Sequence, residues 1–275
     1  MKRISFILWG AAMLFSMTMH AQETDKNIFN HLGVGLSVGT DGLPGIDLST
    51  KVTDYVGVRL GYGFMPKFKF KQDVDYTYDG SDYTTEGEFK LNNGTFKMLF
   101  DIYPAPKSTS FHVTAGFYAG SSELITLKNT ESPIPGIDSK DYGSGSITLG
   151  NPEHNKFVGT DLDGNVKGRV KVNGFRPYLG IGFGRSVPNT LCSVNFDLGV
   201  QFWGKPKMQV YKFDYIKDDD DGTITDKSTW IEFTKKDFEE TDTYEGDKDV
   251  YDILNIVEKI SVYPVISLRV GFRCF

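Results

Sequence analysis

The stretch PYLGIGFGRSVPNTLCSVNFDLGVQFWG, from Pro177 to Gly204, alternates apolar residues with glycine or polar residues on both sides of one short turn. Before the turn, Leu179, Ile181 and Phe183 are separated by glycines, and after it every second position is again apolar. Successive side chains of a β-strand point to opposite faces. The pattern therefore predicts two antiparallel strands that each have one apolar face.

The same two-residue period recurs along the chain and gives eight predicted strands in all. Besides the two strands of the opening stretch, they lie at 31–39, 45–52, 55–64, 95–103, 111–120 and 262–275. The connections alternate in length. Three are short turns, at 52–54, 104–109 and 186–190. Apart from a tight turn at 41–45, the others are long and polar and cover 68–94, 121–173 and 205–259.

Short turns at one end and long loops at the other are typical of transmembrane β-barrels, whose strands alternate between lipid-facing and lumen-facing residues. A soluble sandwich would also alternate, but its strand ends would not sort by loop length. The predicted fold is therefore all-β, an eight-stranded antiparallel up-and-down transmembrane β-barrel with long extracellular loops. Closure matters because an open sheet edge in hydrocarbon would leave backbone groups without hydrogen-bond partners.

Charged residues fall on the face that would line the lumen. They could line a path for ions or substrates, or they could pair into a plug. An interior of eight strands is just wide enough for side chains to fill, which favours the plug. This predicted lumen network consists of Asp47, Lys51, Arg59, Lys97, Asp101, Asp197, Arg269 and Arg273.

Aromatic residues gather near the predicted strand ends. In a membrane barrel they would form girdles at the two interfaces, whereas in a soluble protein they would belong to an ordinary core. The residues in question are Tyr55, Phe64, Tyr103, Phe111, Phe202, Trp203 and Phe272.

The amino-terminal 21 residues have the pattern of a cleaved secretory signal peptide. Lys2 and Arg3 precede an apolar run from Ile4 to Met17, and Ala21 is a plausible last residue before cleavage. The run is short for a membrane-spanning anchor helix, which is the alternative. The expected domains are therefore the signal peptide at 1–21 and the barrel at 22–275. A net charge of −6 gives no basic face for a nucleic-acid partner.

The chain has two cysteines, Cys192 and Cys274, too few for a disulfide scaffold. They lie on predicted neighbouring strands at the same rim and with the same outward direction. A disulfide between them is geometrically feasible, and two free thiols are the alternative.

Four pieces together resemble a family of small outer-membrane β-barrels of Gram-negative, Bacteroides-like bacteria, of the OmpA/OmpW type. The pieces are FKMLFDIYP with FHVTAGFYAG, RPYLGIGFG, FDLGVQFWGKPKMQV, and YPVISLRVGF with a terminal Phe275. The resemblance implies insertion into the outer membrane by the barrel-assembly machinery, and no shared enzymatic motif. It also implies one short helix before the last strand, where 249–260 has apolar residues at helical spacing.

Candidate chemistry is sparse. In KDDDDGTITD (217–226), aligning Gly222 with the glycine of a calcium loop places Asp219 and Asp221 as ligands, but Lys217 and Ser228 do not fit the motif. An acidic hairpin turn is favoured over a weak cation site. Two histidines outside the signal peptide are candidate catalytic groups: His112 would point into the lumen, and His154 lies in a polar loop without a recognisable partner.

The sequence therefore predicts a porin-like cell-envelope protein with a structural, adhesive or ligand-binding surface role, no catalysis and no cofactor. The first alternative is a small porin for small solutes, and the second is a lipid-modifying enzyme. The expected partners are outer-membrane lipid and lipopolysaccharide, the barrel-assembly machinery and an unidentified extracellular ligand.

Overall fold

The computed structural model describes residues 31–79, 81–91, 94–145, 147–148, 157–218, 222–237, 259 and 261–274. The expected signal peptide lies outside the described residues, and so does the expected helix at 249–260 apart from Lys259. Within the described part of the chain, no helix is long and apolar enough to cross a membrane.

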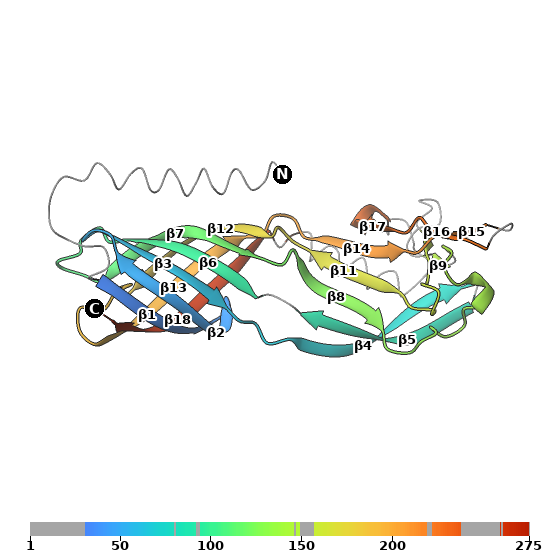
Figure 1. Ribbon diagram of the computed structural model, residues 1–275, viewed down its shortest axis with the longest axis horizontal. Helices are drawn as coiled ribbons and strands as arrows, with labels where there is room; N and C mark the ends of the chain where they lie inside the picture. The colour runs from blue at the N-terminus through green and yellow to red at the C-terminus, as the bar shows by residue number, and fades with distance from the viewer. Residues whose placement is uncertain are drawn as a thin grey trace.

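Eight antiparallel strands close into a barrel in the order β1-β18-β13-β12-β7-β6-β3-β2 (Figure 1). Each of the eight predicted strands is present, with ends that differ by a few residues. Their bounds are β1 (Leu32–Gly39), β2 (Gly42–Lys51), β3 (Val56–Gly63), β6 (Thr95–Ile102), β7 (Phe111–Gly120), β12 (Phe175–Phe183), β13 (Cys192–Phe202) and β18 (Val262–Arg273).

The barrel closes where its first strand pairs with its last. Val34 of β1 lies opposite Phe272 of β18, and Val38 lies opposite Leu268. In the opening stretch, Ile181 of β12 lies opposite Leu198 of β13. Residues directly opposite in an antiparallel pair point to the same face, so this register keeps the apolar residues of neighbouring strands together on one side of the wall.

The long polar segments, expected to be loops, contain a second sheet, and this part of the prediction is wrong. Six antiparallel strands lie in the order β17-β14-β11-β8-β5-β4. Their bounds are β4 (Phe68–Tyr78), β5 (Ser81–Leu91), β8 (Glu123–Asn129), β11 (Lys167–Lys171), β14 (Lys207–Lys212) and β17 (Thr229–Phe233). Short elements complete the described structure: β9 (Ile147–Thr148), β10 (Phe157–Val158), β15 (Tyr215–Lys217), β16 (Ile224–Asp226), and the 3-10 turns η3 (Ser139–Asp141) and η5 (Lys235–Asp237).

The second sheet extends the barrel wall. Its strand order from β4 to β17 follows the order of the barrel strands β3, β6, β7, β12, β13 and β18, to which its strands are joined in the chain. In Figure 1 the sheet projects from the end of the barrel opposite the chain's C-terminus, so the molecule is elongated. Hairpin β1-β2 stops at the barrel rim, which leaves the extension open on that side.

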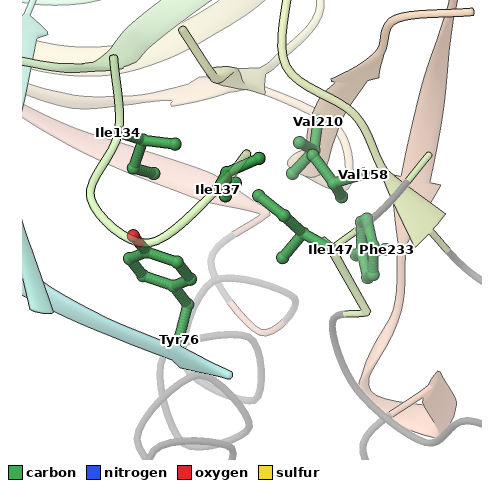
Figure 2. Packing of buried hydrophobic residues seen from close by; sticks show 7 residues of the cluster. All are labelled: Tyr76, Ile134, Ile137, Ile147, Val158, Val210 and Phe233. Atoms are coloured by element: carbon green, nitrogen blue, oxygen red, sulfur yellow. The ribbon is translucent and has the colours of Figure 1, made fainter. Parts of the chain in front are cut away.

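One face of the second sheet carries the apolar core of this part of the molecule. Tyr76, Val210 and Phe233 point from β4, β14 and β17 toward residues of the segment that connects β8 to β11 (Figure 2). That segment contributes Ile134, Ile137, Ile147 and Val158. The opposite face is charged: Lys71 pairs with Glu86 and Lys207 with Glu232. Such a two-faced sheet explains why its strands alternate between apolar and charged residues.

Candidate functional site

The outer face of the barrel is an apolar belt. Leu48 is 63% exposed and Leu179 is 52% exposed, although both lie in the middle of regular strands. The belt continues around the barrel through Leu36, Ile46, Leu60, Tyr62, Phe96, Ile102, Ile181, Phe183, Val194, Phe196, Leu198, Ile266, Leu268 and Val270. A contiguous apolar surface of this extent on a soluble monomer would be exceptional.

The centre of the lumen is a cluster around the Arg59 guanidinium. Arg59 donates hydrogen bonds to both carboxylate oxygens of Asp197, at 2.8 and 3.1 Å, and to Asp101 at 2.7 Å. Thr114 donates to the same Asp101 oxygen at 2.8 Å. His112 places Nε2 3.0 Å from Asp197. Each of the five side chains is buried, so the guanidinium lies between two carboxylates away from bulk solvent.

A second ion pair lies beside this cluster, near the end of the barrel with the short turns. Arg269 donates to Asp47 from Nε at 2.9 Å and from Nη2 at 2.6 Å. It also donates from Nη1 to the carbonyl oxygen of Ser186 at 3.1 Å, and Ser49 donates to the same carbonyl at 2.7 Å. Because Ser186 belongs to the turn between β12 and β13, this pair ties the turn to the inner wall.

A third ion pair lies toward the opposite end of the lumen. Lys97 donates to Asp41 at 2.7 Å, and Tyr118 donates to the same carboxylate oxygen at 3.1 Å. Asp41 was not among the predicted site residues because the sequence places it in the turn before β2. The partnership becomes visible only when the pairing of β2 with β3 and of β3 with β6 brings this turn near Lys97 of β6.

Glycines on the inner wall make room for these large groups. At Gly182, an added Cβ atom would lie 2.5 Å from Nε2 of His112 and 2.6 Å from Oδ1 of Asp197. At Gly35, an added Cβ would overlap the Arg269 guanidinium. The alternation of glycine with apolar residues therefore reflects crowding inside the barrel.

Aromatic and cationic side chains fill the mouth of the barrel below the second sheet. Trp203 stacks on Tyr263 with ring centroids 4.4 Å apart, and the Arg176 guanidinium lies 5.4 Å from the Trp203 ring. Arg176 also donates to the backbone oxygens of Asn173 and Ser121. Arg176 and Trp203 are both buried, so this layer occupies the lumen on the side from which the sheet extends.

The expectation of an exposed aromatic girdle is wrong for Tyr103 and Trp203, which are buried inside the barrel. The Tyr103 hydroxyl accepts a hydrogen bond from the Ser186 amide at 2.8 Å. The Tyr103 hydroxyl and the Trp203 indole nitrogen both have hydrogen-bond partners inside the barrel, which explains why the two side chains point inward. Phe111 is half-buried, and the other residues of the set are exposed on the outer surface: Tyr55, Phe64, Phe202 and Phe272.

Two residues of the predicted lumen network lie at the rim of the barrel. Lys51 pairs with the exposed Asp54 in the turn after β2. Arg273 lies at the end of β18 and donates to the carbonyl oxygen of Asn189 at 3.4 Å. The remaining six, Asp47, Arg59, Lys97, Asp101, Asp197 and Arg269, lie together inside the barrel.

The two cysteines are exposed free thiols, so the disulfide that the sequence left open is not formed. Cys192 lies opposite Phe272, and Cys274 lies past the end of the strand. Asp219, Asp221 and His154 lie outside the described residues. Within the described ranges, no group of three or more His, Cys, Asp or Glu residues could hold a metal ion.

A closed eight-stranded barrel with an apolar outer belt and a packed polar interior is the architecture of a small transmembrane β-barrel. No protein-family model and no curated protein matches the chain. Among solved structures, the chain is similar to Acinetobacter baumannii CarO, with a TM-score of 0.44 and 20% identity over 90% of this chain and 100% of that chain. It is also similar to Acinetobacter baumannii CarO2, with a TM-score of 0.43 and 19% identity over 88% of this chain and 98% of that chain.

Proposed function

We propose that this protein is an outer-membrane β-barrel whose filled interior anchors a β-sheet outside the membrane, with a structural, adhesive or ligand-binding role at the cell surface. The observation that carries the proposal is the burial of the ion-paired lumen. Arg59, Asp101 and His112 are at most 3% exposed, so bulk solvent does not reach them. A barrel filled in this way is a rigid support, and its function lies in what it holds at the surface.

The outer-membrane location is supported by the closed barrel, because closure leaves no unpaired strand edge in the hydrocarbon. The turns β2-β3, β6-β7 and β12-β13 and the C-terminal end of β18 lie at one end of the barrel, and the second sheet lies at the other (Figure 1). In bacterial barrels the short turns face the periplasm and the longer segments face outward. The proposal therefore orients the second sheet toward the outside of the cell.

In this proposal, outer-membrane lipid and lipopolysaccharide surround the apolar belt. The segment 1–21 directs export, and the barrel-assembly machinery then inserts the barrel. A catalytic role is not part of the proposal. His112 and Thr114 are the histidine and hydroxyl nearest to an acid in the lumen, but Thr114 donates to Asp101 while His112 faces Asp197. This arrangement does not place a hydroxyl nucleophile against a histidine base.

We expect the protein to give no stable ion conductance. Purified chain reconstituted into planar bilayers is expected to show the baseline current of protein-free membranes, because the charged layers and the Trp203 layer fill the lumen. A known outer-membrane porin in the same bilayers serves as the positive control. Stepwise currents from the unmodified chain would contradict a filled lumen and would favour the alternative, a small porin for solutes.

The proposed orientation has its own test. Protease added to intact cells is expected to cut the β4-β5 hairpin, whereas the turn between β12 and β13 is cut only after the outer membrane is opened. A cysteine-reactive label that cannot cross the membrane gives the matched control, because Cys192 and Cys274 lie at the short-turn end and are exposed. Labelling of these thiols on intact cells would show that the short-turn end faces the outside of the cell, opposite to the proposed orientation.

A further inference from the structure

The apolar face of the second sheet carries a partly open cavity of about 130 Å³. The lining comes from all six strands of the sheet and from the segment that covers it. The lining residues used in the argument are Thr85, Gly87, Leu127, Gly168, Met208 and Val210. Ile134, Ile147 and Val158 of the covering segment line the other side and belong to the cluster drawn in Figure 2.

The cavity is large for a void left by imperfect packing. Protein interiors have few voids larger than a water molecule. A cavity of about 150 Å³ lined by apolar side chains stays free of water and binds a molecule the size of benzene. The cavity in the second sheet has a comparable size and a comparable lining, so it is suited to a compact apolar guest.

One polar group in the lining has no partner among the residues that the structure describes. Thr85 is 6% exposed, and its hydroxyl makes no hydrogen bond to any of them. The other polar side chains of the lining are already paired: Tyr76 donates to the Pro135 carbonyl, and Asn129 accepts from the Val166 amide at 2.8 Å. A buried hydroxyl without a partner is unfavourable, and a guest with one hydrogen-bonding group would satisfy it.

We propose that this cavity is a binding site for a compact, mostly apolar molecule, about the size of one aromatic ring, that carries a single hydrogen-bonding group for Thr85.

The site is preformed because two tyrosines attach the covering segment to β4. Tyr76 donates to Pro135, and Tyr78 donates to Asp141. Burial raises the pKa of Tyr76 to about 12, and the hydrogen bond to Asp141 raises the pKa of Tyr78 to about 12. Both hydroxyls are therefore protonated donors at neutral pH. Their two hydrogen bonds hold the covering segment in place without a bound guest.

Gly168 gives a direct way to fill the cavity. An added Cβ at this position would lie 3.5 Å from Leu127, which is ordinary van der Waals contact, so a larger side chain can grow into the space. Gly168→Val is expected to abolish binding, and β-branched residues suit strands. Leu127→Phe fills the same cavity from β8 and serves as the second variant, with folding checked by circular dichroism and heat-modifiable gel mobility.

The experiment uses 4-fluorophenol and 4-fluorotoluene as probes with the whole barrel in lipid nanodiscs, observed by 19F NMR. The unmodified chain is expected to give a protein-bound 4-fluorophenol resonance, distinct from that of empty nanodiscs. Both cavity-filling variants are expected to lose it. Absence of the bound resonance in the unmodified chain, or its persistence in the folded filling variants, would overturn the site.

Thr85→Val tests the polar contact because valine keeps the shape and removes the hydroxyl. Binding of 4-fluorophenol is expected to weaken about 2- to 10-fold, the effect of losing one ordinary hydrogen bond, with 4-fluorotoluene unaffected. Thr126→Val, on a neighbouring strand and outside the cavity lining, is the matched control and is expected to leave both probes unchanged. An equal change for the two probes in Thr85→Val would overturn the role of the hydroxyl.

Discussion

Replacing Asp197 with alanine is expected to destabilise the folded barrel by about 3–5 kcal/mol, the usual cost of removing one partner of a buried ion pair. The change takes away both of the hydrogen bonds between Arg59 and Asp197 and also the partner of His112. Asp101 still accepts from Arg59 at 2.7 Å, so part of the charge compensation remains. The free energy of unfolding is measured by urea titration of the micelle-bound chain, followed by tryptophan fluorescence.

Lys51→Ala is the matched control for an ion pair outside the lumen. Lys51 and Asp54 lie 2.7 Å apart, but their side chains are 33% and 55% exposed. Exposed pairs of this kind contribute at most about 1 kcal/mol. Equal losses for Asp197→Ala and Lys51→Ala would show that the buried network does not stabilise the barrel.

The barrel could be predicted from the sequence because its wall separates two constant environments. Each of the eight barrel strands has an apolar outer face and a second face toward a narrow interior. Alternation such as Leu179, Ile181 and Phe183 against glycine is therefore regular and can be read from the local sequence alone. The closing pair β1-β18 followed from the same pattern, because an open edge would be unfavourable in hydrocarbon.

The second sheet was missed although part of its pattern is visible. In 67–91, Phe68, Phe70, Val74 and Tyr76 alternate with charged residues, and Asp79 is followed by glycine, a strong hairpin signature. Asp79 indeed has a positive φ of 48°. However, β11 and β17 have five residues each, too few to establish a period. Their place in the sheet depends on contacts between distant segments, which local alternation does not encode.

The partners inside the lumen could not be assigned from sequence for a related reason. The alternation of side chains places Arg59, Asp101 and Asp197 on the inner face. Which acid pairs with which base depends on the stagger between strands around the whole barrel. Arg59 reaches across the interior to Asp197, although β3 and β13 are not neighbours. For Trp203, the alternation that places Phe202 on the outer face predicts the inward direction that the structure shows, whereas its position at a strand end alone suggests a girdle.

Replacing Leu179 with arginine is expected to destabilise the inserted barrel by about 2–4 kcal/mol, because a cation on the lipid-facing side near the bilayer centre is costly. Leu179 lies in the middle of β12, is 52% exposed, and is flanked on neighbouring strands by Ala115 and Val200. In a water-soluble protein, the same change at such an exposed position would cost little and would improve solubility. The substitution therefore distinguishes hydrocarbon from water as the medium around the belt. Stability is measured by urea titration of the barrel folded into liposomes.

Thr126→Arg provides the control, because it adds the same charge to the second sheet beyond the barrel and is expected to have little effect. A second measurement tests the depth dependence. Phe272 lies near the barrel end, and Phe272→Arg is expected to cost less than Leu179→Arg, since the penalty for arginine falls to about 0–1 kcal/mol near the interface. If Leu179→Arg, Phe272→Arg and Thr126→Arg all unfold at the same urea concentration as the unmodified chain, lipid does not cover the apolar belt. A graded loss from Thr126 to Phe272 to Leu179 would instead locate the hydrocarbon region on the barrel wall residue by residue.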